Sequence, residues 1–136
     1  MAGKDLKMIA RNERGAVLLE LVITSMIILV IWTGMCNTAL LFKDKLAVIA
    51  VAREAGREAA ATGNLSRGEQ KGREMMDITK IRDKAEINVY WYESPYLAAE
   101  VTCRSPLVLP GMGALLGHPW EKEITLKTTK IFRAEP

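Results

Sequence analysis

The chain has 136 residues, which is enough for one small domain beside a membrane helix. Its net charge is only +3, its basic residues are scattered and its aromatic residues are few, so the composition argues against a nucleic-acid-binding protein. The single histidine, His118, lies in a predicted loop without a cysteine or carboxylate cluster, so we expect no metal site and no cofactor.

A long apolar run follows a basic leader at the start of the chain. Residues 1–15 are polar and mixed in charge, so we expect them to be disordered or frayed. A helix should begin near Ala16 and cross a membrane to about Phe42, and between Leu21 and Phe42 the only ionisable group is the thiol of Cys36. A helix of about 22 residues rises roughly 33 Å, enough for a hydrocarbon core of about 30 Å.

Glu20 is the one charged residue in this run, and a charge inside a membrane segment is costly. A glycine, Gly15, followed by a hydrophobic helix with glutamate as the fifth residue after it resembles the class III signal of type IV pilins. The resemblance implies that a prepilin peptidase cuts after Gly15, which leaves Ala16 as the new N-terminus and Glu20 as the residue that sets the register between assembled chains. The alternative is an ordinary signal anchor with an acidic residue at its edge.

The helix is expected to continue beyond the membrane. Lys43-Asp44-Lys45 indicates the water interface, the stretch 46–61 contains strong helix formers, and Gly63 provides a glycine-type stop. The segment Ala50–Ala61 resembles the Ala-Arg-Glu-Gly-Ala-Arg pattern that follows the membrane helix in TadE-like proteins of tight-adherence secretion systems. Its alanines and glycine form a face of small side chains, which suits either packing on the chain's own domain or an assembly surface.

The rest of the chain predicts a short helix and three strands. A capping box at Ser66–Glu69 should start a helix that runs to about Ile78, with its methionines and Ile78 facing inward. Period-two patterns then predict an antiparallel hairpin and a last strand, whose inward residues are Ile87, Val89 and Trp91, then Leu97, Ala99, Val101 and Cys103, and finally Ile124, Leu126, Thr128 and Phe132. Lys130 falls on the apolar face of the last strand, which indicates an edge strand or a bulge.

An apolar loop rich in proline and glycine separates the hairpin from the last strand. Its leucines follow neither a helical nor a strand period, and a connection of this length is often functional. We therefore expect the loop to carry the partner-contact surface of the head, through Leu107, Leu109, Leu115 and Leu116.

The predicted fold is α+β, with a leader (1–15), a transmembrane helix (16–45) and an extracytoplasmic head (46–136) that holds a short helix and a three-stranded antiparallel sheet. This order of elements is also similar to TadE-like proteins. The resemblance implies a structural minor pilin or pseudopilin of a tight-adherence (Flp-type) system. Such a protein sits in the inner membrane as a single-pass protein, and its partners are the prepilin peptidase, other pilins, the assembly machinery and membrane lipid. It also implies later incorporation into an extracellular pilus.

Neither a nucleophile with a base at motif spacing nor a phosphate loop is present in the sequence, so we expect no enzyme. The alternative function is an unprocessed membrane anchor whose head recruits a partner protein. The two hypotheses share the fold and the membrane span, and they differ in the fate of the leader.

Overall fold

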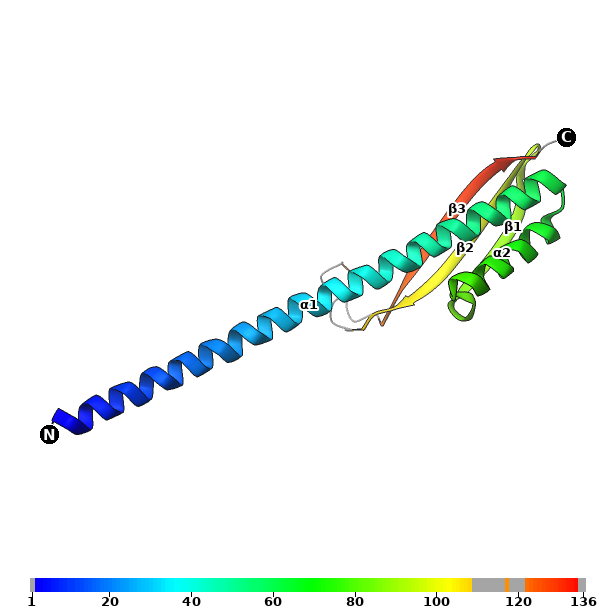
Figure 1. Ribbon diagram of the computed structural model, residues 1–136. Helices are drawn as coiled ribbons and strands as arrows, with labels where there is room; N and C mark the ends of the chain where they lie inside the picture. The colour runs from blue at the N-terminus through cyan, green and yellow to red at the C-terminus, as the bar shows by residue number, and fades with distance from the viewer. Residues whose placement is uncertain (1, 109–116, 118–121, 135–136) are drawn as a thin grey trace. The chain divides into compact units, whose positions relative to one another are not determined.

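The computed structural model describes residues 2–108, 117 and 122–134, with side chains from Gly15 onward. The chain forms helices α1 (Ala2–Thr62) and α2 (Leu65–Thr79), the 3₁₀ turn η1 (Arg82–Lys84), and strands β1 (Ala85–Glu93), β2 (Tyr96–Pro106) and β3 (Glu123–Arg133) (Figure 1). This is the α+β fold that the sequence predicts. The chain divides into two compact units, Met1–Cys36 and Asn37–Pro136, which we describe separately.

The first unit is the N-terminal part of α1. The helix begins at Ala2 and not near Ala16, so the expectation of a disordered leader is wrong. The physical reason is local, because the leader contains no proline and is rich in Lys, Arg, Leu, Met and Ala, which favour helices. Within the described residues, α1 is the one helix that is long and apolar enough to cross a membrane.

The second unit, which we call the head, begins at Asn37 and includes the C-terminal part of α1. Gly63 follows the end of α1 with a φ of 63°, which confirms the predicted glycine stop. The capping-box prediction is wrong, because Asn64 is the N-cap of α2. Its Oδ1 accepts hydrogen bonds from the backbone N–H groups of Ser66 (2.9 Å) and Arg67 (3.4 Å), so Ser66 lies inside the first turn.

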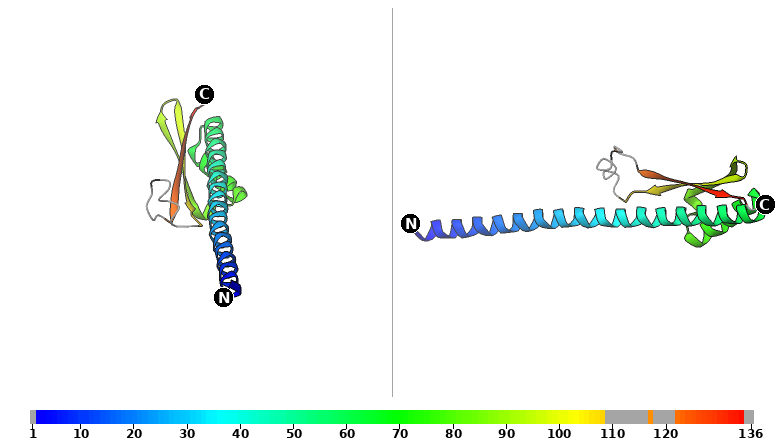
Figure 2. Two further views of the ribbon diagram at one scale, coloured as in Figure 1. Left: turned by 90° about the vertical axis from the view of Figure 1, so that its left-hand side faces the viewer. Right: turned by 90° about the horizontal axis from the view of Figure 1, so that it is seen from above.

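The strands form one antiparallel sheet in the order β1-β2-β3, as predicted. Ile87 lies opposite Val101, which lies opposite Thr128, and this register places the predicted inward residues of all three strands on one face. Both helical segments of the head lie on that face, as the two views in Figure 2 show. The order of strands also confirms that Lys130 lies on an edge strand.

Glycines in the two helices allow larger side chains of the sheet to pack closely against the helix backbone. A Cβ placed on Gly56 of α1 would lie 2.0 Å from the Phe132 ring on β3, and one on Gly72 of α2 would lie 2.2 Å from Ile87 on β1. The small side chains of α1 that face the sheet and α2 are fully buried, namely those of Ala52, Ala55 and Ala59. The small-residue face therefore packs within the chain's own domain, and this answers the choice that the sequence left open.

Two residues predicted to face inward are exposed instead. Trp91 is 46% exposed and Ile78 is 73% exposed. Trp91 lies on an edge strand beside a register shift between Trp91 and Glu93, close to the turn that ends the hairpin. Ile78 lies in the last turn of α2, where Met76 is the buried residue. The ends of short elements thus depart from the pattern of their centres.

Candidate functional site

The first group of candidate residues lies near the start of the apolar part of α1. A Cβ placed on Gly15 would meet no described atom within 4 Å, whereas those on Gly56 and Gly72 would collide with a neighbouring layer. Glycine inside a helix costs roughly 1 kcal/mol relative to alanine. Packing therefore explains Gly56 and Gly72, and it leaves Gly15 without a structural reason within the described residues.

Glu20 is exposed on this helix, and so is Ala16. The two residues are four positions apart, so they lie one helical turn, about 6 Å of rise, from each other. Among the side chains that the structure describes, none forms an ion pair or a hydrogen bond with Glu20. A carboxylate at this position has no partner from the described part of its own chain.

Two hydroxyl side chains of the apolar run, those of Ser25 and Thr33, differ from Glu20 in this respect. The hydroxyl of Ser25 donates a hydrogen bond to the Val22 carbonyl at 2.8 Å, and that of Thr33 donates to the Leu29 carbonyl at 2.7 Å. Such bonds to the helix backbone satisfy a hydroxyl in surroundings without water. A carboxylate has no proton to donate when it is charged, so Glu20 requires a cation or a donor from elsewhere.

The second group is a buried polar cluster that the sequence did not reveal. Asp44 of α1 is 5% exposed, and its Oδ2 accepts hydrogen bonds from Lys84 Nζ and Ser105 Oγ, both at 2.5 Å. Burial raises the pKa of Asp44, but the hydrogen bonds from Lys84 and Ser105 and the positive charges of Lys84 and Lys43 outweigh it, so the pKa lies below its ordinary value. The cluster ties α1 to η1 and β2.

Two residues of the stretch Lys43-Asp44-Lys45, where the water interface is expected, make contacts inside the head. Asp44 is buried, and the ammonium of Lys45 donates hydrogen bonds to the Lys127 carbonyl and the Thr128 hydroxyl, both at 3.0 Å. Lys43 alone is exposed. One signal could have indicated the cluster, because Ser105 continues the inward period of β2 and a polar residue in that phase needs a buried partner.

The loop leucines were predicted to form the contact surface of the head. Leu107 is 8% exposed, and its backbone N–H donates a hydrogen bond to the Lys122 carbonyl at 2.8 Å, so its side chain belongs to the interior of the head. Val108 beside it is 59% exposed, and its N–H donates to Asn37 Oδ1 at 2.8 Å. Leu109, Leu115, Leu116 and His118 lie outside the described residues.

These features define a class in structural terms: one helix that is long and apolar enough to cross a membrane, joined in sequence to an α+β head. Compared with known protein families, with curated proteins and with solved structures, the chain shows no match.

Proposed function

We propose that this chain is a structural minor pilin or pseudopilin of a tight-adherence (Flp-type) pilus or secretion system. In this proposal a prepilin peptidase removes residues 1–15, the apolar helix holds the protein in the inner membrane, and the head lies outside the cytoplasm. The protein then joins other pilins through its N-terminal helix, and it has no enzymatic activity.

The observation that carries the proposal is the presence of Gly15 and Glu20, five positions apart, on one exposed apolar helix. Gly15 has no packing role among the described residues, and Glu20 has no partner there. The stretch from Gly15 to Cys36 would rise about 33 Å, which matches a hydrocarbon core of about 30 Å. Cleavage after Gly15 would explain the glycine and provide the missing cation for the glutamate.

The free amine of Ala16 is that cation, with an ordinary pKa of about 7.7–8.0. An unpaired carboxylate costs around 2.5–3.5 kcal/mol at the centre of a membrane helix, and less near its edge. Pairing Glu20 with the Ala16 amine of a neighbouring chain offsets this cost. Because only one sliding position brings the two groups together, the pair also sets the axial register between neighbours.

A single substitution tests this role of Glu20. Glu20→Gln retains the size and hydrogen-bonding ability of the side chain but removes its charge, so we expect normal cleavage and membrane insertion with loss of incorporation into sheared pili. Ser25→Ala is the matched control, because Ser25 satisfies its hydroxyl on the Val22 carbonyl and should assemble like the wild type. A Glu20→Gln protein that is cleaved, inserted and still incorporated would remove the assembly role.

A further inference from the structure

The chain that leaves β2 runs alongside α1 towards the first residue of the head. Ser105 Oγ donates a hydrogen bond to Asp44 Oδ2, and three residues later the N–H of Val108 donates one to Asn37 Oδ1 at 2.8 Å. Three residues of extended chain cover about 10 Å, and the helix from Asp44 back to Asn37 covers about 10.5 Å. The chain from Ser105 to Val108 is therefore parallel to the axis of α1.

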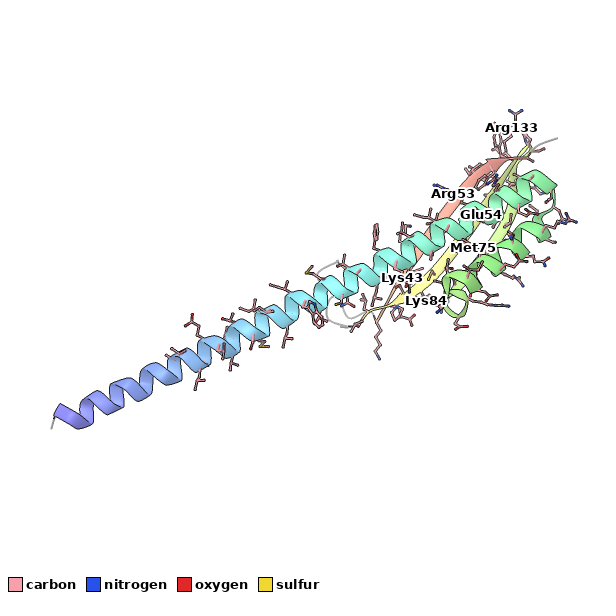
Figure 3. The ribbon with its side chains drawn as sticks, in the orientation of Figure 1. Lys43, Arg53, Glu54, Met75, Lys84 and Arg133 are labelled. Atoms are coloured by element: carbon pink, nitrogen blue, oxygen red, sulfur yellow. The ribbon has the colours of Figure 1, made fainter. Side chains whose placement is uncertain are left out.

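This path brings Val108 to a level of α1 that has no charged side chain. Asn37 is the first residue of the head and directly follows Cys36, where the apolar unit ends. The next charged residue after it is Lys43, which lies about 9 Å further along the helix. Figure 3 shows Lys43 and Lys84 at one end of the head and Arg133 at the other. Val108 thus lies at the end of the head where the apolar run enters it.

Exposed apolar side chains surround α1 at this end of the head. Leu40 is 43% exposed, Phe42 is 64% exposed and Val108 is 59% exposed. Leu40 and Phe42 are two positions apart, about 200° around the helix, so they face different sides, and Val108 lies on the side of β2. One protein partner would cover one side of the helix, whereas lipid surrounds a membrane segment on all sides.

The charges near this end are arranged as at the end of a membrane segment. Lys43 and Lys122 are exposed, and the Lys122 carbonyl accepts a hydrogen bond from the Leu107 N–H at 2.8 Å, which places Lys122 beside the end of β2. Glu123, an exposed acid of this end, lies opposite Pro106 and so nearer to the level of Asp44. Lysine side chains at this height reach the phosphates of lipid headgroups while their stems stay in apolar surroundings.

Asn37 supplies the hydrogen bond that such a position requires. It is a polar residue inside the apolar run and is only 3% exposed. A backbone N–H that leaves water without an acceptor is costly, and the Oδ1 of Asn37 accepts from the N–H of Val108. In the sequence, residues 107–120 include no Asp, Glu, Lys or Arg. The chain can therefore approach lipid here without an unpaired N–H at Val108.

We propose that this end of the head contacts the phospholipid bilayer, with Leu40 and Val108 in its interfacial layer and Phe42 at the outer limit of that layer. A bilayer measures about 30 Å across its hydrocarbon core and about 40–45 Å with both interfacial layers, which leaves roughly 5–7 Å on each side. Because the core ends near Cys36 in the proposed function, this layer begins at Asn37. The inference rests on the membrane span of the proposed function, and it requires neither cleavage of the leader nor the role of Glu20.

Quenching by lipid-bound nitroxides tests this contact. The full-length chain with Val108→Cys and Cys36→Ala carries a small fluorophore on the new cysteine, in phosphatidylcholine nanodiscs whose acyl chains hold a nitroxide near the headgroup. The fold should be retained, because the side chain of Val108 is exposed and its hydrogen bond uses the backbone. Burial raises the pKa of the Cys103 thiol, so that residue should take up little label, and the Cys36→Ala chain without a new cysteine is the blank.

Two reference positions set the scale. Cys36 in the wild type marks the end of the membrane span, and Ser94→Cys with Cys36→Ala marks the exposed turn beside Tyr96, which pairs with Arg133 at the far end of the head. Quenching at position 108 should lie within about twofold of that at Cys36 and exceed that at position 94 at least about threefold. Iodide in the water should show the reverse order for positions 108 and 94.

The outcomes separate this inference from the proposed function. Lipid quenching at position 108 as weak as at position 94, with Cys36 strongly quenched, would overturn the lipid contact and leave the membrane span in place. A label at position 108 that neither quencher reaches would be covered by protein, which also overturns the contact. Weak lipid quenching at Cys36 itself would remove the membrane span, and with it both the inference and the proposed function.

Discussion

The ring of Phe132 on β3 occupies the space that any side chain larger than hydrogen would need at position 56 of α1. A Cβ placed on Gly56 would lie 2.0 Å from Cε2 of Phe132 and 2.3 Å from its Cδ2. Gly56 lies in the segment that resembles the TadE-like pattern, and its small size is required by the chain's own sheet. The contact fixes how closely α1 approaches β3 within the head.

Replacing Gly56 with alanine should therefore destabilise the head. Overpacking typically costs about 1–3 kcal/mol, and the better helix propensity of alanine returns roughly 1 kcal/mol. Denaturant unfolding of the full chain in detergent measures the net loss. Phe132→Leu removes the ring that collides, so the double variant should be more stable than the sum of the two single effects predicts. Strict additivity would show that Gly56 and Phe132 do not constrain each other.

The Asp44 cluster should make the stability of the head fall at acidic pH. The pKa of Asp44 is lowered in the folded protein by its contacts with Lys84 and Ser105. These contacts therefore stabilise the folded head fully above the ordinary unfolded pKa of about 3.9, and this stabilisation is lost as the pH falls through the folded pKa. Unfolding free energies measured between pH 7 and pH 2 should fall more steeply for the wild type than for Asp44→Asn. Identical pH profiles for the two proteins would rule out this contribution.

Removing the cation of the same cluster should act at neutral pH. Lys84→Met leaves the buried carboxylate of Asp44 with the hydrogen bond from Ser105 but without its cation, and the loss of one hydrogen-bond partner of a buried group costs about 1–3 kcal/mol, more when the group is charged. The expected result is a lower free energy of unfolding at pH 7. Arg82→Met is the matched control, because its ion pair with Asp77 is exposed and should contribute at most about 1 kcal/mol. Equal effects of the two substitutions would contradict the importance of burial at Asp44.

Trp91 and Leu97 are opposite one another on β1 and β2 but differ in burial. Trp91 is 46% exposed and Leu97 is fully buried. Leu97→Ala should cost about 2–5 kcal/mol, whereas Trp91→Ala should cost clearly less than the roughly 3–5 kcal/mol of a core aromatic residue. Thermal unfolding of both variants checks the difference, and a larger loss for Trp91→Ala would place its ring in the core.

The leucines of the loop require two separate tests, one for burial and one for partner contact. Leu107 is buried, so Leu107→Ala should lower the melting temperature, with a loss of about 2–5 kcal/mol. The predicted contact role stays with Leu115 and Leu116, whose replacement by serine should impair incorporation into pili and leave the melting temperature nearly unchanged. A large fall in the melting temperature of that double variant would assign the two residues to the core.

The centres of the long periodic segments could be read from the sequence, because their apolar pattern repeats over many residues. The antiparallel sheet, its inward face through Val101 and Leu126, and the stop at Gly63 all follow from such patterns. Features that depend on distant partners could not be read in this way. Asp44 looks solvated between two lysines until Lys84 and Ser105 are brought to it by the fold. The N-cap was missed because Asn64 and Ser66 offer equivalent local chemistry.

The candidate site was predictable in part. The spacing of Gly15 and Glu20 is visible in the sequence, and the structure adds that neither residue has a role in packing within the described residues. The burial of Leu107 was not predictable, since its apolar character suits an interior and a contact surface equally well. Its place in the interior is fixed by the hydrogen bond of its backbone to Lys122 across the base of the loop.

Cleavage after Gly15 is the central claim, and the mass of the mature N-terminus tests it most directly. Protein purified from native membranes and analysed by mass spectrometry should begin at Ala16, and a Gly15→Leu variant should retain its leader. An intact wild-type chain that begins at Met1 or Ala2 would contradict the pilin proposal and favour an unprocessed membrane anchor.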